Sequence, residues 1–194
     1  MNHPRLTVIA GANGSGKTTL TRSNQIDFRE FPLLDPDVIG NTLQTVMPKT
    51  FPIAAARQVL TSAREHVRNG KNFAIETTLS GKNYLQMMLD ARARRFEIVL
   101  VYIGTENVEI NLARIRNRVL RGGHNVPEQD VRRRYQRSLA NLPLAIERAD
   151  RTILFDNSNP AEQGYRLVAM LGASIDQQFP PIPDWATPIT GKFL

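Results

Sequence analysis

The chain has 194 residues, which suffices for one α/β domain with a buried sheet but not for two domains of ordinary size, so we expect a single domain over residues 1–194. With 41% hydrophobic and 22% charged residues, it is neither disordered nor fibrous, and the lack of cysteine excludes disulfides and thiolate metal sites. The net charge of +7 indicates either a solvated or nucleic-acid-binding face or a pocket for phosphate-bearing substrates.

Short apolar runs alternate with segments of helical period in the first half of the chain, a pattern typical of parallel βαβ units. In the segment 53–67 the apolar residues recur three or four apart, and Gly70 is placed to end this helix. The pattern predicts strands at 6–10, 33–34 and 72–76. It also predicts three helices: one that begins near residue 16, one at 53–67 and one at 84–93.

The second half continues the alternation and begins with a β-branched run typical of a central parallel strand. The expected elements are a strand at 97–103, helices at 108–119 and 127–146, and a strand at 152–155. Pro143 predicts a kink or break in the second helix. The segment 165–171 fits either an edge strand or a last helix, and the proline-rich tail after Phe179 is expected to pack as an irregular strap.

The strongest motif lies between the first strand and the first helix, where residues 11–18 match the phosphate-loop pattern G-x-x-x-x-G-K-[ST] in full. Glycines let successive backbone N–H groups point at phosphate oxygens, and the following helix directs its positive end to the same place. We expect Lys17 to reach the β- and γ-phosphates and the Thr18 hydroxyl to ligate Mg²⁺. The predicted ATP-binding residues are Gly11, Ala12, Asn13, Gly14, Ser15, Gly16, Lys17, Thr18 and Thr19.

Two missing features argue against two classes of phosphate-loop protein, the guanine-binding proteins and the motor and switch ATPases. The chain has no N-K-x-D segment of the kind that reads guanine, and the strand at 99–104 ends without the acid that motor and switch ATPases usually carry. The remaining class is the kinases, in which the acids lie elsewhere and a lid supplies arginines.

Acidic and hydroxyl side chains follow two of the predicted strands, at the edge where ligands bind in open α/β sheets. Asp37 is a candidate general base for an attacking hydroxyl, with Asp35 as a second candidate or a substrate ligand. The alternative is a turn at Asp35 and a helix cap at Asp37. Glu76, Thr77 and Thr78 are candidates for substrate binding, Glu76 also for a Mg²⁺-bound water, and the alternative for them is a strand-end cap.

Arginine is concentrated in the residues 114–137, which we predict to form a helical lid around a flexible Gly-Gly-His turn. Arg114, Arg118 and Arg121 share one helix face, and Arg134 follows on the next helix, just off its apolar stripe. Closing guanidinium groups can stabilise a transferring phosphoryl group. The alternatives are a solvated surface and a nucleic-acid footprint.

Four motifs in this order, covering about residues 6–157, resemble the short zeta-toxin-like P-loop kinases. They are Gly-Ala-Asn-Gly-Ser-Gly-Lys-Thr-Thr, Leu34-Asp35-Pro36-Asp37, Ile75-Glu76-Thr77-Thr78-Leu79-Ser80-Gly81, and Arg121-Gly122-Gly123-His124-Asn125-Val126-Pro127 with Arg133-Arg134-Tyr135. The resemblance implies a toxin that phosphorylates a sugar hydroxyl of UDP-N-acetylglucosamine and an antitoxin that blocks the nucleotide site.

The same resemblance assigns roles to individual residues. It implies that Lys17 and Thr18 contact phosphate and Mg²⁺ and that Asp37 is the catalytic base. It further implies that Glu76 and Thr78 bind the substrate, and that two lid arginines clamp phosphate: Arg118 or Arg121, and Arg134.

Together these observations predict an α/β, nucleoside-kinase-like P-loop NTPase fold with three layers, a mainly parallel sheet and a helical lid. The predicted activity is transfer of the ATP γ-phosphate to a hydroxyl of a small molecule, with ATP and Mg²⁺ as cofactors and a sugar nucleotide and an antitoxin as partners. Alternatives are a kinase of an antibiotic, another sugar or a polynucleotide end, and an ATP-driven binding switch. No apolar run is long enough to cross a bilayer, so we expect no membrane partner. We also expect a cytoplasmic protein, and we do not expect nucleic acid as a partner.

Overall fold

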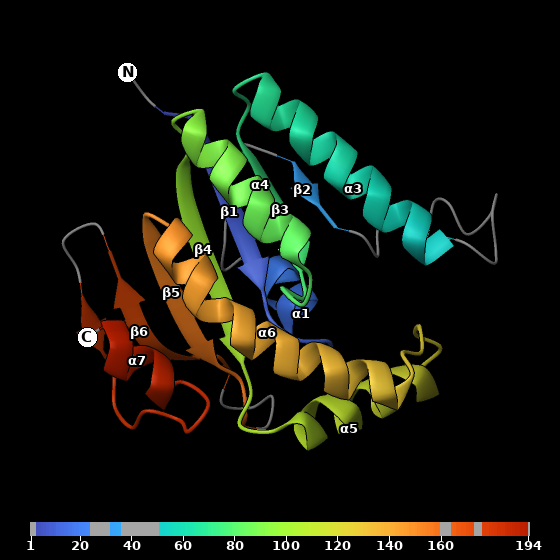
Figure 1. The fold of residues 1–194 in the computed structure, drawn as a ribbon. Helices are drawn as coiled ribbons and strands as arrows, with labels where there is room; N and C mark the ends of the chain where they lie inside the picture. The colour runs from blue at the N-terminus through green and yellow to red at the C-terminus, as the bar shows by residue number, and fades with distance from the viewer. Residues whose placement is uncertain (1–2, 24–31, 36–50, 160–163, 173–175, 194) are drawn as a thin grey trace.

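The computed structural model describes residues 3–23, 32–35, 51–159, 164–172 and 176–193; the predicted base Asp37 lies outside the described residues. Seven strands form one sheet in the order β2-β3-β1-β4-β5-β6-β7 (Figure 1). Their bounds are β1 Arg5–Ala10, β2 Leu33–Leu34, β3 Phe73–Thr77, β4 Glu97–Gly104, β5 Arg151–Asp156, β6 Arg166–Leu171 and β7 Gln177–Gln178. The strands β1 to β5 are parallel, and β6 and β7 pair antiparallel. The mainly parallel sheet is therefore confirmed.

The helices pack on both faces of this sheet because its central strands are apolar on both sides. The helices are α1 Lys17–Arg22, α3 Phe51–Arg68, α4 Lys82–Ala93, α5 Val108–Leu120, α6 Glu128–Arg148 and α7 Thr187–Phe193. On β4, Leu100 and Tyr102 join the core formed with α3, α4, α6 and α7, whereas Val101 and Ile103 pack with Leu20 of α1 on the other face. This alternation is the period of two expected of a strand covered on both sides.

The helix α5 and the first half of α6 form a hairpin at one end of the sheet (Figure 1), with a small core of its own. The second half of α6 packs in the main core through Leu142, Ala145 and Ile146. Leu112 and Ile115 of α5 pack against Val131 of α6, with Val108 and Val126 at the margin. Asn107 caps the amino end of α5, because its side chain accepts hydrogen bonds from two backbone N–H groups of the first turn. The segment predicted as a lid thus forms a helical hairpin, and its action as a lid stays a prediction.

The structure decides or corrects three expectations about the second half of the chain. The undecided segment is a strand, β6, which pairs with β5. Of the predicted kink or break at Pro143, the break is wrong, because α6 continues through this residue as one helix, and the kink stays a prediction. The tail is not wholly irregular, because α7 forms where Ala186 and Ile189 bury their side chains in the main core. Burial thus overrides the weak helix propensity of a segment that contains proline and glycine.

No helix in the described part of the chain combines the length and the apolar character that a membrane crossing requires.

Candidate active site

The phosphate loop leaves the carboxyl end of β1 and leads into α1, so it lies at the edge where parallel strands of an α/β sheet present ligands. Gly14 and Gly16 have φ values of 80° and 107°, in the left-handed region that favours glycine. Lys17 is buried, and its Nζ donates a hydrogen bond to the Ala12 carbonyl at 3.2 Å. The loop therefore has the curled backbone and the inward lysine that phosphate binding requires.

Thr18 and Glu76 meet beside this loop. The Thr18 hydroxyl donates to Glu76 Oε1 at 2.9 Å, and the carboxylate of Glu76 is almost fully buried. Strand β3, which carries Glu76, pairs directly with β1, and Glu76 stands opposite Ile9 in the register. An acid therefore does lie next to the phosphate loop, on β3 rather than at the end of β4.

These two residues fit a Mg²⁺ ion bound together with nucleotide. Mg²⁺ prefers hard oxygen ligands and usually takes one or two carboxylates together with phosphate oxygens and water. A hydroxyl and a buried carboxylate supply that donor set. Among the described residues no group of three or more His, Cys, Asp or Glu could hold a metal by itself, so a metal here would depend on the nucleotide.

The segment after β3 forms a compact turn rich in hydroxyl groups. Thr77 is buried and accepts a hydrogen bond from the Leu79 amide, while Thr78 and Ser80 bond each other at 2.9 Å through their hydroxyls. Leu79 has a φ of 56°, unusual for a branched side chain, and its carbonyl accepts from Asn141 of α6 at 2.8 Å. Thr77 thus serves the turn, and Thr78 is the more accessible of the two predicted substrate ligands.

Asp35 directly follows the short strand β2 and is buried. Strand β2 pairs with β3, which carries Glu76, so the two acids follow neighbouring strands of the same edge. The structure therefore brings Asp35 to the side of the phosphate loop where Glu76 lies.

The arginines predicted to belong to the lid make different contacts. Arg134 of α6 reaches the phosphate loop, where it donates to the side-chain oxygen of Asn13 at 3.3 Å. Arg118 instead folds back within the lid and donates to the His124 carbonyl at 2.8 Å, and Arg121 is exposed where α5 ends. The structure thus brings Arg134 to the loop and leaves the roles of Arg118 and Arg121 as predictions.

Arg114 reaches the segment after β5. It donates to the Asn159 carbonyl at 3.1 Å, and its second terminal nitrogen is buried without a hydrogen-bond partner. Burial lowers the pKa of Arg114 from its ordinary value, an effect that nearby Tyr165 and Asp156 oppose. A guanidinium in such a partly desolvated place can face an anionic or aromatic ligand group.

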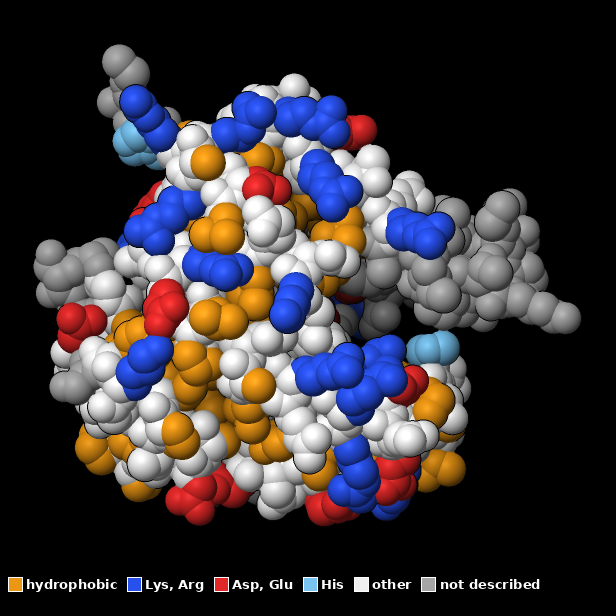
Figure 2. Space-filling model, in the orientation of Figure 1, with side chains coloured by type: hydrophobic (Ala, Val, Ile, Leu, Met, Phe, Trp, Pro, Cys, Tyr) orange, Lys and Arg blue, Asp and Glu red, His pale blue; other side chains and the backbone are white. Residues whose placement is uncertain are grey.

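Three other arginines of the hairpin pair with acidic side chains, and basic and acidic groups lie side by side on this part of the surface (Figure 2). The ion pairs are Arg116 with Glu128, Arg132 with Glu109 and Glu128, and Arg133 with Asp130. Exposed pairs of this kind contribute little to stability. The charges of these three arginines are therefore balanced by acids, and none of the three is among the arginines predicted to bind phosphate.

Three further residues touch the loop, and the sequence arguments did not find them. Asn111 donates to the Asn13 carbonyl at 2.7 Å, Asn157 donates to the Ser15 carbonyl at 2.7 Å, and Tyr165 donates to the Gly16 carbonyl at 2.7 Å. Of the three, only Asn111 could have been noticed in the sequence, because it is a polar residue at an apolar position of its helix. The structure shows that it is fully buried.

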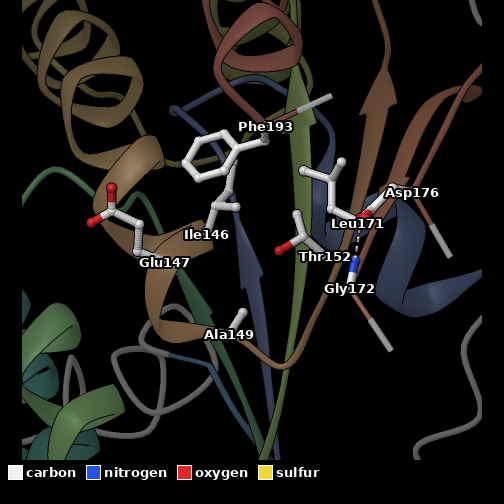
Figure 3. A pocket seen from close by; sticks show the side chains of 8 residues that line it. All are labelled: Ile146, Glu147, Ala149, Thr152, Leu171, Gly172, Asp176 and Phe193. Carbon is white, nitrogen blue, oxygen red and sulfur yellow. Dashed lines mark hydrogen bonds between the residues drawn. The ribbon is translucent and has the colours of Figure 1, made fainter. Parts of the chain in front are cut away.

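A shallow pocket of about 200 Å³ lies elsewhere, between the end of α6, the start of β5 and α7 (Figure 3). Its lining includes Ile146, Thr152, Leu171 and Phe193. Thr152 is near the amino end of β5, whereas the phosphate loop lies at the carboxyl ends of the strands. This pocket is therefore separate from the candidate site.

No protein-family model matches the chain. A protein of Haemophilus influenzae, described only as an uncharacterized protein, is 39% identical over 125 residues, which is 64% of this chain and 88% of that protein. The chain belongs to one family with this Haemophilus influenzae protein.

Solved structures share the fold at low sequence identity. The chain is similar to the structure of the PezAT chromosomal toxin–antitoxin system of Streptococcus pneumoniae, with a TM-score of 0.62, 17% identity and coverage of 100% of this chain and 86% of that chain. It is similar to the AvrRxo1-ORF1:-ORF2 complex with ATP, with a TM-score of 0.69, 16% identity and coverage of 98% and 63%. It is also similar to shikimate kinase from Acinetobacter baumannii in complex with shikimate, with a TM-score of 0.51, 20% identity and coverage of 81% of this chain and 86% of that chain. These similarities confirm the P-loop kinase fold and, for the fold, the resemblance to zeta-toxin-like kinases.

Proposed function

We propose that this protein transfers the γ-phosphate of ATP to a hydroxyl group of a small molecule. The observation that carries the proposal is the convergence at one sheet edge of a complete phosphate loop, the pair of Thr18 and Glu76, and Arg134 from the lid. Phosphoryl transfer requires positioning and charge stabilisation more than covalent chemistry, and these groups supply both.

The phosphate loop would hold the triphosphate of ATP. Its inward N–H groups and Lys17 would neutralise the β- and γ-phosphates, and Lys17 would exchange its bond to the Ala12 carbonyl for one to phosphate. The Thr18 hydroxyl and the Glu76 carboxylate would hold Mg²⁺, directly or through water. When bound, this ion would supply charge neutralisation to the phosphate oxygens.

On the acceptor side, Asp37 is the proposed general base and Asp35 the alternative. Asp35 is buried after β2, where a carboxylate can approach a hydroxyl bound near Glu76 and Thr78. Arg134, which rests on Asn13 in this structure, lies close enough to the loop to stabilise the charge that develops on the transferring group.

The proposed acceptor is a UDP-activated amino sugar such as UDP-N-acetylglucosamine. Support comes from the turn at 76–81, whose hydroxyl and carboxylate groups suit a polyhydroxylated ligand, and from the resemblance of its sequence to zeta-toxin-like kinases. The shared fold with toxin–antitoxin structures supports an antitoxin that would cover the nucleotide site. We further propose that the protein acts in the cytoplasm, where ATP and sugar nucleotides occur.

The test is transfer of labelled phosphate from ATP to a panel of acceptors, with Lys17→Ala as the inactive control. The panel contains UDP-N-acetylglucosamine and related UDP-sugars, free sugars, an aminoglycoside and an oligonucleotide with a 5′-hydroxyl. Labelled UDP-sugar is the expected product. Labelling of another acceptor would keep the kinase and change its substrate, whereas ATP hydrolysis stimulated only by a protein or DNA would favour a binding switch.

A further inference from the structure

The outward carbonyl groups of the phosphate loop are held by side chains from distant parts of the chain. Asn111 of α5 donates to the Asn13 carbonyl, and Asn157, which follows β5, donates to the Ser15 carbonyl, each at 2.7 Å. The donors lie 98 and 142 residues away from the carbonyls in sequence. The loop is therefore fixed from two sides by the tertiary structure.

The orientation of each peptide unit explains why these bonds matter. A phosphate loop binds anions only while its N–H groups point inward, and in a planar peptide the carbonyl then points the opposite way. Both contacts are partly buried, and an outward carbonyl with little access to water needs a donor, because an unsatisfied one destabilises that orientation. Asn111 and Asn157 meet this need at Asn13 and Ser15.

The Asn111 amide is oriented by a second contact, and both asparagines pack closely against glycines of the loop. Asn111 is fully buried, and its side-chain oxygen accepts a hydrogen bond from the Thr105 hydroxyl, so its NH₂ group is directed at the loop. A Cβ atom added to Gly16 would collide with the side-chain nitrogen of Asn157. At Gly14 it would lie 2.6 Å from the carbonyl oxygen of Asn111. Two of the glycines in the loop thus make room for the elements that hold it.

Tyr165 adds a third contact, of a different kind. Its hydroxyl donates to the Gly16 carbonyl, which also accepts from the amides of Thr19 and Leu20 in the first turn of α1. The Gly16 carbonyl is therefore satisfied without Tyr165, and the two asparagines are the contacts that the loop depends on.

We infer that Asn111 and Asn157 are positioning residues that hold the phosphate loop in its anion-binding conformation without touching the nucleotide. The inference rests on the proposed function, because it concerns the same phosphate site. It assigns a role in nucleotide affinity to residues on α5 and after β5. It also links the lid hairpin to the loop through Asn111.

The test uses Asn157→Leu, which keeps the approximate volume of the side chain and removes the donor. The matched control is Asn141→Leu, because Asn141 is also half-buried and also donates to a backbone carbonyl, that of Leu79, which belongs to the turn after β3 and not to the phosphate loop. The probe is inorganic tripolyphosphate, which has no base or sugar, measured by isothermal titration calorimetry beside ATP. Thermal unfolding of both variants measures the loss of stability.

Asn157→Leu is expected to weaken tripolyphosphate and ATP binding by roughly tenfold, the usual net effect of one hydrogen bond, while Asn141→Leu binds both normally. Asn111→Ser, which removes the amide with less strain than a larger side chain, is expected to act in the same direction. In turnover, the KM for ATP should rise more than kcat falls. Equal affinities in Asn157→Leu, Asn141→Leu and wild type would overturn the inference alone. A wild type that binds neither tripolyphosphate nor ATP would overturn the proposed function as well.

Discussion

The Thr18 hydroxyl donates a hydrogen bond to Glu76 Oε1 at 2.9 Å, joining the first turn after the phosphate loop to the end of the neighbouring strand. In the proposed function, this contact would place a buried carboxylate beside the Mg²⁺ ion of the nucleotide complex. The carboxylate on β3 would then take the place of an acid at the end of β4, because β3 and β4 pair with β1 on its two sides.

Glu76→Gln is expected to raise the Mg²⁺ concentration needed for half-maximal turnover and to lower kcat. Glutamine can still accept the bond from Thr18, but it has lost the charge that attracts the ion. Turnover measured against Mg²⁺ concentration checks this, with Glu109→Gln on the exposed surface of α5 as the control. A Mg²⁺ titration identical to that of wild type would remove Glu76 from the metal site.

Lys17→Ala is expected to abolish ATP-dependent activity and leave the fold intact. The side chain is buried against the Ala12 carbonyl in the loop itself, so its loss removes a phosphate contact rather than a core contact. Steady-state kinetics and circular dichroism check this, with the exposed Lys71→Ala as the control. Normal turnover with an unchanged KM for ATP would contradict the phosphate-loop assignment.

Asp37→Asn is expected to lower kcat far more than it weakens ATP binding, because loss of a general base typically costs about 10²–10⁴-fold in rate. The matched variant is Asp35→Asn, two residues earlier in the same segment. Kinetics of both variants with ATP titrations decide between them. Full activity of Asp37→Asn together with loss in Asp35→Asn would transfer the role to Asp35.

Arg134→Ala is expected to reduce kcat by an amount typical of lost transition-state charge stabilisation, a few kcal/mol. Arg134→Lys should restore only part of it, since lysine lacks the planar fork of the guanidinium. The control is Arg137→Ala, because Arg137 lies one turn further along α6 and is exposed. This variant should keep nearly the wild-type kcat. We also expect a loss in Arg118→Ala or Arg121→Ala if the lid closes on the substrate. Equal loss of DNA binding in all four alanine variants, with unchanged turnover, would indicate a nucleic-acid footprint instead.

Gly104→Ala is expected to destabilise the protein by about 1–3 kcal/mol, the usual cost of overpacking a core. A Cβ at Gly104 would collide with the Trp185 ring, whose indole nitrogen donates to Asp156 at 3.0 Å and pins the C-terminal tail to the sheet. Gly81→Ala is the control, because a Cβ there meets nothing within 4 Å. Equal urea midpoints for the two variants would contradict this packing argument.

Much of the fold could be predicted from local patterns. The apolar runs gave every parallel strand to within one or two residues, and the glycine-rich motif marked the loop. The tail was misjudged because α7 depends on burial of Ala186 and Ile189 against a core that its own residues do not reveal. A pattern within one segment carries no information about the surface that later covers it.

The site was predicted less completely, because its contacts join distant segments. The sequence placed Glu76 at a strand end, but only the strand order brings it to Thr18. Arg134 and Arg118 looked alike as lid residues, yet one reaches Asn13 and the other His124. Side-chain direction on a short hairpin depends on packing, which spacing alone does not determine.

The proposed kinase activity is tested most directly by phosphoryl transfer by the wild-type protein from γ-labelled ATP, in the presence of Mg²⁺, to the acceptor panel. We expect a labelled small-molecule product, with UDP-N-acetylglucosamine or a related UDP-sugar as acceptor, and no product with Lys17→Ala. ATP bound by the wild type without label in any hydroxyl acceptor, together with hydrolysis that depends on a macromolecule, would contradict the claim that this protein is a small-molecule kinase.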